Sequence, residues 1–324
     1  MNQALRSDLD IDSQFLHSVT DGLSQFKKSL SSRYFYDDRG SELFAQIMAL
    51  PEYYLTRSEM QIFKEQSKQI CVSLDILSDR LEVVELGAGD GSKTQHLLKQ
   101  LLKSHTQITY RPIDISSGAL NSLKQQMHKT LPDLKIQTLC GDYFEKLEQL
   151  QASAEQKLVL FIGSNLGNLD DMQAKSFIQR LSHTLNPGDY LLLGLDLIKS
   201  ERIVLPAYSD AAGITAQFNL NLLRRINREL DADFDLKSFK HVAKYEESEG
   251  YAKSYLESLK PQTVTLGVSG DQFRFEKGEQ IHTEISRKYS DSLLAELIQG
   301  CQLTLTRKFT DPKGYFADYL LKKN

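Results

Sequence analysis

The sequence predicts an α/β fold, in which a parallel β-sheet is covered by helices on both faces and is joined to a second domain. Apolar segments typical of strands alternate with helix-like segments between Leu81 and Leu195. These strand segments are continuously apolar, as expected for strands buried on both faces. After Asp196 the pattern changes to short segments separated by glycine-containing turns, which indicates a second architecture. At roughly 150 residues per domain, 324 residues leave room for both.

The elements of the first two hundred residues follow from hydrophobic periodicity. The first sixty residues are typical of amphipathic helices, broken near Ser31–Ser32 and at Pro51. Strands are then expected at Leu81–Leu86, Ile108–Ile115, Lys135–Leu139, Leu158–Ile162 and Tyr190–Leu195. Helices are expected between them at Thr94–Lys103, Gly118–Thr130 and Gln173–Thr184. This alternation is typical of a parallel sheet.

The last part of the chain divides into an insertion and a return to the sheet. A helix is expected at Leu220–Leu230, followed by an antiparallel meander made of Val242–Glu257, Thr263–Val268, Phe273–Phe275 and Ile281–Ile285. The end of the chain predicts a helix at Asp291–Gly300 and strands at Leu303–Phe309 and Tyr315–Leu321, which could form an antiparallel edge. We therefore expect one domain from residues 58–198 plus 287–324, and a discontinuous α+β domain from 1–57 plus 199–286.

Composition excludes several classes of protein. The chain is 40% apolar with a net charge of −4 and has no basic block, so a nucleic-acid partner is not expected. Its apolar runs are too short to cross a bilayer, and its start lacks the pattern of a secretory signal. Cys71, Cys140 and Cys301 are too few and too widely spaced for a disulfide framework or zinc. We expect a cytoplasmic protein without metal that acts on a small molecule.

A glycine-rich loop directly after the first strand is the strongest local signal. Gly87, Gly89 and Gly91 follow that strand and precede a helix that Ser92 or Thr94 would cap. Such a loop lets a ligand approach bare backbone at a helix N-terminus. The spacing G-x-G-x-G differs from the dinucleotide pattern, and Glu85 would repel a pyrophosphate but suit a cationic ligand. S-adenosylmethionine (AdoMet) is cationic at sulfur and carries no phosphate.

Acidic residues at the ends of the next two strands support the same ligand. Asp114 is placed to bind a ribose, while Asp142 and Tyr143 are placed to meet an adenine. The alternative is a glycine-rich turn with solvated acids. Cys140 and His96 lie near this region, but packing or surface exposure explains them better than chemistry.

Several longer segments resemble the histidine-specific AdoMet-dependent methyltransferase family. They run in the order of that family from about residue 30 to the C-terminus, and some lie outside the general methyltransferase core. These segments are Tyr34–Asp37, Gly40–Phe44, Leu50–Arg57, Glu85–Gly89, Phe161–Leu169, Leu193–Leu197, Ala212–Asn219, Ile226–Leu230 and Thr283–Tyr289. The resemblance implies a Rossmann-like class I AdoMet-dependent methyltransferase core with a substrate-binding domain, and methylation of the α-amine of L-histidine to hercynine, as in ergothioneine biosynthesis.

The resemblance also implies roles for individual residues. Tyr53, Tyr208 and Asn168 match positions that hold the carboxylate and amino group of the amino acid, and Asn168 and Tyr208 are the catalytic candidates. Glu284 and Ser286 match the pair that contacts the imidazole, with Tyr36 as a further contact. Gly87, Lys93, Asp114, Asp142 and Tyr143 match the AdoMet site, to which the loop adds Glu85 and Gly89. Two residues apart on a strand, Glu284 and Ser286 share a face with His282, which we interpret as structural.

One departure from the family pattern concerns the side-chain pocket. Ser254 stands where the histidine enzyme carries a methionine that lines the pocket. Two alternatives therefore stay open: the same chemistry on another amino acid or derivative, such as one like tryptophan, and an AdoMet-binding protein without catalysis. We expect a monomer.

Overall fold

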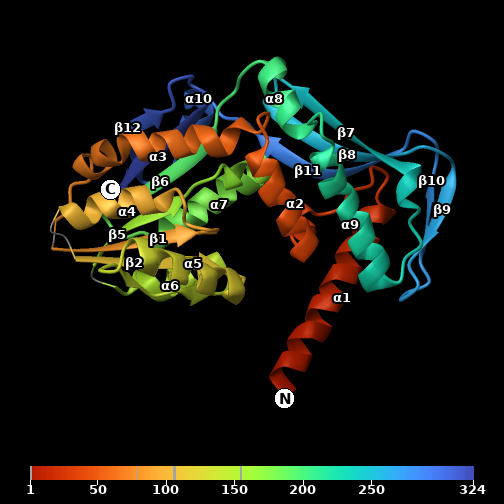
Figure 1. Cartoon of the computed structure of the whole chain (residues 1–324), viewed down its shortest axis with the longest axis horizontal. Coiled ribbons are helices and arrows are strands. Elements are labelled where there is room, and N and C mark those ends of the chain that lie inside the picture. Colours follow the sequence, from red (N-terminus) through yellow and green to blue (C-terminus); the bar gives the residue numbers. More distant parts are fainter. Residues whose placement is uncertain (1, 78, 105–106, 154) are drawn as a thin grey trace. The chain divides into compact units, whose positions relative to one another are not determined.

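The chain divides into two compact units in the computed structural model, which describes residues 2–77, 79–104, 107–153 and 155–324, with side chains from residue 13 onward (Figure 1). The core unit comprises Leu55–Ile198 and Arg287–Asn324. The appended unit comprises Met1–Tyr54 and Lys199–Ser286. The chain thus leaves the core unit once and returns to it, and each unit is described separately below.

The core unit is built on one twisted sheet with the strand order β12-β13-β6-β5-β1-β2-β3, with β4 paired to β2. Its strands are β1 (Arg80–Leu86), β2 (Gln107–Asp114), β3 (Lys135–Ile136), β4 (Leu139–Cys140), β5 (Gln156–Phe161), β6 (Tyr190–Asp196), β12 (Leu303–Thr310) and β13 (Phe316–Lys323). Strands β1 to β6 pair in parallel, whereas β12 and β13 return antiparallel at one edge. This is an α/β Rossmann-like fold with an antiparallel edge, as the sequence predicts.

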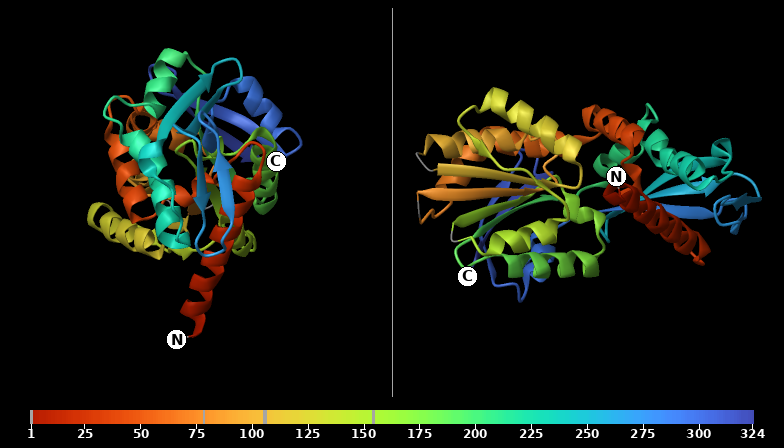
Figure 2. Two further views of the ribbon diagram at one scale, coloured as in Figure 1. Left: turned by 90° about the vertical axis from the view of Figure 1, so that its right-hand side faces the viewer. Right: turned by 90° about the horizontal axis from the view of Figure 1, so that it is seen from below.

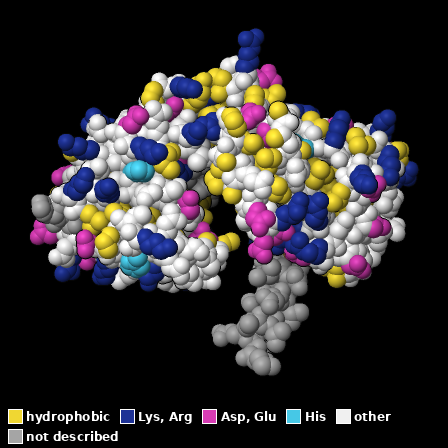
Figure 3. Space-filling view, viewed as in Figure 1, with side chains coloured by type: hydrophobic (Ala, Val, Ile, Leu, Met, Phe, Trp, Pro, Cys, Tyr) yellow, Lys and Arg dark blue, Asp and Glu magenta, His cyan; other side chains and the backbone are white. Residues whose placement is uncertain are grey.

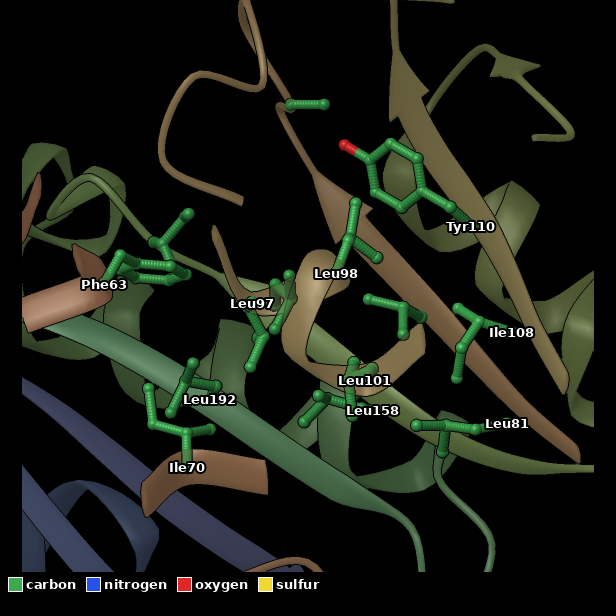
Figure 4. Packing of buried hydrophobic residues seen from close by; sticks show 14 of the residues in the cluster. Phe63, Ile70, Leu81, Leu97, Leu98, Leu101, Ile108, Tyr110, Leu158 and Leu192 are labelled. Carbon is green, nitrogen blue, oxygen red and sulfur yellow. The ribbon is translucent and has the colours of Figure 1, made fainter. Parts of the chain in front are cut away.

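Helices cover both faces of this sheet, which explains the continuously apolar strands (Figure 2). On one face lie α3 (Tyr54–Val72), α4 (Thr94–Lys103) and α5 (Ser117–Thr130). On the other lie α6 (Tyr143–Gln151), α7 (Asp171–Thr184) and α10 (Asp291–Ile298). Figure 4 shows side chains of α3 and α4 packed on Leu158 and Leu192 of the strands. Each fully buried leucine contributes about 1.5–3 kcal/mol, so this packing holds the helices on the sheet.

The strand order reverses between β1 and β5. From β1 the chain continues outward to β2, β3 and β4, and then crosses to β5 on the other side of β1. In open α/β sheets, ligands bind beyond the carboxyl ends of the strands at such a switch point. The loops after β1 and β5 are therefore the place to look for a site in this unit.

The appended unit packs helices against small antiparallel sheets. Its helices are α1 (Asn2–Ser24), η1 (Ser32–Phe35), α2 (Asp38–Ala49), α8 (Glu201–Tyr208), α9 (Ile214–Leu230) and η3 (Leu236–Ser238). Its strands are β7 (Phe239–Glu246), β8 (Tyr251–Ser258), β9 (Gln262–Thr265), β10 (Gln272–Phe275) and β11 (Gln280–Arg287), the last of which ends in the core unit. Residues from α1, α2, α9 and these strands form one apolar cluster.

Several expectations from the sequence need correction. The single strand expected at Lys135–Leu139 is two short strands, β3 and β4. The expected meander is two sheets, β11-β8-β7 and β10-β9. Helices α6 and α8 were not expected, and α9 begins at Ile214 rather than Leu220. Polar residues such as Asp142 and Ser200, which cap α6 and α8, gave those short segments the pattern of loops.

Charges of both signs are mixed over the visible surface of each unit (Figure 3). Lys and Arg side chains stand among Asp and Glu side chains rather than gathering into one stripe. Among the described residues, no helix has the length and hydropathy needed to cross a membrane.

Candidate active site

The loop after β1 takes the conformation that its glycines allow. Gly87 has a φ of +69°, and a Cβ added there would lie 2.7 Å from the hydroxyl oxygen of Tyr143. A side chain at this position would therefore meet both backbone strain and a collision. The loop leaves bare backbone beside Tyr143, which brings together two of the residues predicted to bind the cofactor.

Glu85 lies beneath this loop rather than on its surface. Its carboxylate is fully buried and accepts a hydrogen bond of 2.7 Å from Thr94 and a second bond from Tyr110. Burial raises the pKa of Glu85 to about 7, against the lowering effects of these two hydrogen bonds and of the Lys93 charge. Thr94 thus bonds to β1 and does not cap its own helix, and Ser92 does not cap it either, contrary to the prediction.

Asp114 and Asp142 both stand at strand ends, as expected, and both shape the local backbone. Asp114 accepts a hydrogen bond of 2.9 Å from the amide of Ser116, which turns the chain toward α5. Asp142 caps α6 by accepting bonds from the amides of Phe144 and Glu145 at 2.9 and 3.2 Å. Each of these bonds uses the Oδ1 oxygen of its carboxylate.

Lys93 is held at the switch point by a residue that the sequence analysis did not single out. Glu59 of α3 is fully buried and forms an ion pair with Lys93, which stands just before α4. The second oxygen of Glu59 accepts a hydrogen bond of 2.7 Å from the amide of Gly163, directly after β5. One carboxylate therefore joins the loops after β1 and β5, on the two sides of the switch point.

Asn168 belongs to the segment that follows β5. It ends the short helix η2 (Asn165–Asn168), which begins after Ser164 in a left-handed conformation with a φ of +58°. The hydroxyl of Ser164 accepts a hydrogen bond of 3.1 Å from the amide of Asp196, and this bond fixes the turn against β6. Asn168 is exposed at the carboxyl edge of the sheet.

Four of the predicted substrate residues lie together in the appended unit. The hydroxyl of Tyr208 donates a hydrogen bond of 2.7 Å to the hydroxyl of Ser286, and both side chains are buried. The hydroxyl of Ser254 lies 3.5 Å from a carboxylate oxygen of Glu284. Since these residues come from α8, β8 and β11, the fold assembles a polar cluster from distant parts of the sequence.

Tyr36 faces the same cluster. Burial raises the pKa of its hydroxyl, and the nearby Glu284 and Tyr208 raise it further. The residue as a whole is 46% exposed. Its ring packs edge-on against the ring of Phe44, with 5.5 Å between the ring centroids. The ring of Tyr53 also packs edge-on against Phe44, with 6.2 Å between the centroids. Tyr36 and Tyr53 therefore both contact the ring of Phe44.

The predicted substrate residues are divided between the two units. Asn168 belongs to the core unit, and the other predicted substrate residues belong to the appended unit. His282 contacts the ring of Tyr255 at 5.3 Å between centroids, and burial lowers its pKa, which agrees with a structural role. Among the described residues, no cluster of three or more His, Cys, Asp or Glu side chains could hold a metal ion.

Sequence reasoning missed Glu59 and Asp318, and each had a detectable signal. Glu59 lies on the apolar stripe of α3, between Leu55 and Ile62, where a charged residue is unusual. Asp318 lies inside the otherwise apolar start of β13 and is fully buried. A charged side chain at a core position of an apolar element is the pattern that would have found both.

Comparisons with known proteins agree along nearly the whole chain. Residues 15–323 match the profile of a family described as histidine-specific methyltransferase, SAM-dependent. A histidine N-alpha-methyltransferase of Mycolicibacterium smegmatis is 40% identical over 300 residues, covering 92% of each chain. One from Mycobacterium tuberculosis is 36% identical over 305 residues, covering 94% of each. Ergothioneine biosynthesis protein 1 of Schizosaccharomyces pombe is 29% identical over 303 residues, which cover 91% of this chain and 39% of that protein.

Proposed function

This chain belongs to the histidine-specific, SAM-dependent methyltransferase family, and from that premise we propose how its residues perform the reaction. It is an N-methyltransferase that takes methyl groups from AdoMet (SAM) and transfers them to the α-amino group of L-histidine, giving hercynine. The observation that carries this conclusion is the family match over residues 15–323, which spans both compact units. A cytoplasmic location and a monomeric state stay predictions.

The residues at the switch point suit AdoMet. Bare backbone at Gly87 and Gly89, with positive φ at both, leaves space that a side chain would fill. We assign ribose binding to Asp114 and adenine binding to Asp142 and Tyr143. Lys93 supplies the cation for the carboxylate of the methionine moiety. Glu85 acts through the loop, because its buried carboxylate is already bonded to Thr94 and Tyr110.

The polar cluster of the appended unit suits the histidine side chain. Glu284 accepts a hydrogen bond from one imidazole nitrogen and Ser286 bonds to the other, with Tyr36 on the ring side. An amino acid with a purely apolar side chain would offer Glu284 no hydrogen bond in place of the one from the imidazole N–H, at a cost of about 1–3 kcal/mol. We assign the carboxylate of the substrate to Tyr53 and Tyr208, and its amino group to Asn168.

The reaction requires little acid–base catalysis by the protein. AdoMet supplies an electrophilic methyl group, and transfer requires a neutral amine aligned behind the bond between sulfur and methyl. The sulfonium charge favours the neutral amine, because a second cation nearby is disfavoured. The side-chain carbonyl of Asn168 accepts from the amine and orients its lone pair. Tyrosine rings such as Tyr36 accommodate the quaternary product, at about 0.5–2 kcal/mol per ring contact.

A pooled assay tests the proposal. The protein is incubated with AdoMet and an equimolar mixture of the common amino acids, and each amino acid is followed by mass. Histidine alone should gain methyl groups, with release of S-adenosylhomocysteine. Consumption of another amino acid while histidine stays unmodified would contradict the assignment of the substrate, and no turnover with any amino acid would contradict catalysis.

The small side chain of Ser254 favours one alternative class of substrate, an amino acid with a larger side chain than histidine. Its side chain is 1% exposed and its hydroxyl lies 3.5 Å from Glu284, so a small polar group adjoins the proposed imidazole site. More space there would admit a larger side chain, such as one like tryptophan. The same assay decides between the two, because it ranks both amino acids in one mixture.

A further inference from the structure

A buried pair of carboxyl groups, Glu59 and Asp318, lies behind Lys93 in the core unit. Both side chains are fully buried. Gly194 of β6 stands opposite Asp318 of β13 in the sheet. An oxygen of Glu59 and one of Asp318 lie 2.3 and 2.9 Å from the point where a Cβ on Gly194 would sit. The absent side chain of Gly194 thus makes the space in which the two carboxyl groups meet.

The two carboxyl groups have unequal surroundings. Glu59 accepts from the amide of Gly163 and pairs with Lys93, so its negative charge is compensated. Neither oxygen of Asp318 has a hydrogen-bond donor among the described parts of the chain. A buried carboxylate without donors is strongly disfavoured, whereas a protonated carboxyl can donate to a carboxylate beside it.

We propose that Asp318 carries a proton that it donates to Glu59, and that Glu59 so supported is the positioning residue that holds Lys93 and Gly163 for AdoMet binding. This inference rests on the proposed role of Lys93. Of this pair, only Glu59 then presents a negative charge to Lys93. Glu59 also links the loop after β1 to the loop after β5, because each of its two oxygens bonds to one of these loops.

The charges around the pair agree with this assignment. Burial, and then the Glu59 charge, hold the pKa of Asp318 well above its usual range, while Lys93 acts in the opposite sense. The Glu59 carboxylate raises the pKa of Lys93 against the effect of burial, so the lysine stays charged. Glu85 is a further carboxyl group that faces Lys93, and it is bonded to Tyr110 and Thr94.

The first arm of the test reads the proton directly. Infrared spectra at pH 8.5, above the pKa of about 7 of Glu85, should show the carbonyl band of a protonated carboxyl group that shifts in deuterated water. The band should vanish in Asp318→Asn and persist in Glu85→Gln. No such band in the unmodified protein, or its survival in Asp318→Asn, would overturn the protonation of Asp318.

The second arm measures S-adenosylhomocysteine binding by calorimetry. Glu59→Gln keeps the size and one acceptor oxygen but removes the charge, and should weaken binding at least tenfold. It should raise KM for AdoMet by a similar factor, with kcat at saturation changed less than threefold. Glu82→Gln is the matched control, because Glu82 is also buried in the core unit and paired with a cation, Arg111 at 2.6 Å. Equal affinity loss in both variants would show a general structural effect and contradict the proposal.

The Lys93→Met variant distinguishes a failure of the positioning role of Glu59 from a failure of the proposed role of Lys93. If this variant binds S-adenosylhomocysteine as tightly as the unmodified protein, the proposed role of Lys93 fails, and that of Glu59 fails with it. If Lys93→Met weakens binding while Glu59→Gln does not, only the positioning role is overturned. In the double variant, we expect an affinity loss no greater than that of Lys93→Met alone, because both changes break one unit.

Discussion

The hydroxyl of Tyr208 donates a hydrogen bond of 2.7 Å to the hydroxyl of Ser286, which is 78 residues later in the chain. Tyr208 is the last residue of α8, and Ser286 is the last residue of the appended unit. Both side chains are buried, so the bond sets the orientation of two hydroxyls assigned to the amino-acid substrate.

Tyr208→Phe removes this hydroxyl and little else. We expect KM for histidine to rise about tenfold, since a lost hydrogen bond to a buried polar group amounts to about 1–3 kcal/mol. Affinity for S-adenosylhomocysteine should stay unchanged. Steady-state kinetics check this, with Tyr319→Phe as control, because Tyr319 is a buried tyrosine whose hydroxyl bonds to Asp291 in the core unit. An equal rise in both variants would argue against the assignment.

Glu284→Gln keeps the shape of the side chain and removes its charge. Because hydrogen bonds to charged groups are worth about 1.5–3 kcal/mol, we expect KM for histidine to rise by roughly 10- to 100-fold. Glu257→Gln is the control, since Glu257 lies on β8 of the same sheet and pairs with Lys240 at the surface, at 2.9 Å. An unchanged KM in Glu284→Gln would place the imidazole elsewhere.

Gly87→Ala tests the glycine loop. The new Cβ meets the hydroxyl of Tyr143 at 2.7 Å, and the φ of +69° strains any side chain by about 1–3 kcal/mol. Binding of S-adenosylhomocysteine, measured by calorimetry, should weaken more than tenfold. Gly300→Ala carries a similar strain at a φ of +82° but meets open space, and should leave this affinity intact. A similar loss in Gly300→Ala would show that backbone strain alone disturbs the unit.

His241 on β7 makes the appended unit sensitive to acid. Its Nε2 is buried and has no hydrogen-bond partner among the residues that the structure describes, and burial lowers the pKa of His241 to about 4, against a raising effect of Asp210. The unfolded chain therefore binds more protons below about pH 6.5, so stability falls as the pH drops from about 6.5 to 4, by up to about 3 kcal/mol. Hydrogen exchange of the β7 amides should speed up over this range in the unmodified protein and much less in His241→Gln. His17→Gln, at an exposed histidine, should behave like the unmodified protein.

The sequence is informative about the fold wherever one face or both faces of an element are apolar. The strand expected at Leu81–Leu86 is β1 from Arg80, and the helix expected at Thr94–Lys103 has those bounds. The return of the C-terminal strands to the sheet is also confirmed. Short helices such as α6 and α8 were not predicted, because their polar caps and their short length hide the hydrophobic periodicity.

The residues of the candidate site also differ in how far the sequence predicts them. The glycine loop and its acids are local patterns, so Gly87 and Asp114 could be named from spacing alone. Tyr208 and Ser286 required a family resemblance, because nothing local says that they meet. Glu59 and Asp318 depend on long-range packing around Gly194, and no motif links residues 59, 194 and 318.

The central claim is that this chain places methyl groups from AdoMet on the α nitrogen of histidine. The most direct measurement is tandem mass spectrometry of the product formed from histidine and AdoMet carrying a labelled methyl group. We predict three labelled methyl groups, all on the α nitrogen, and an unmodified imidazole. A methyl group on an imidazole nitrogen, or histidine recovered without label while S-adenosylhomocysteine accumulates with another acceptor, would contradict the account.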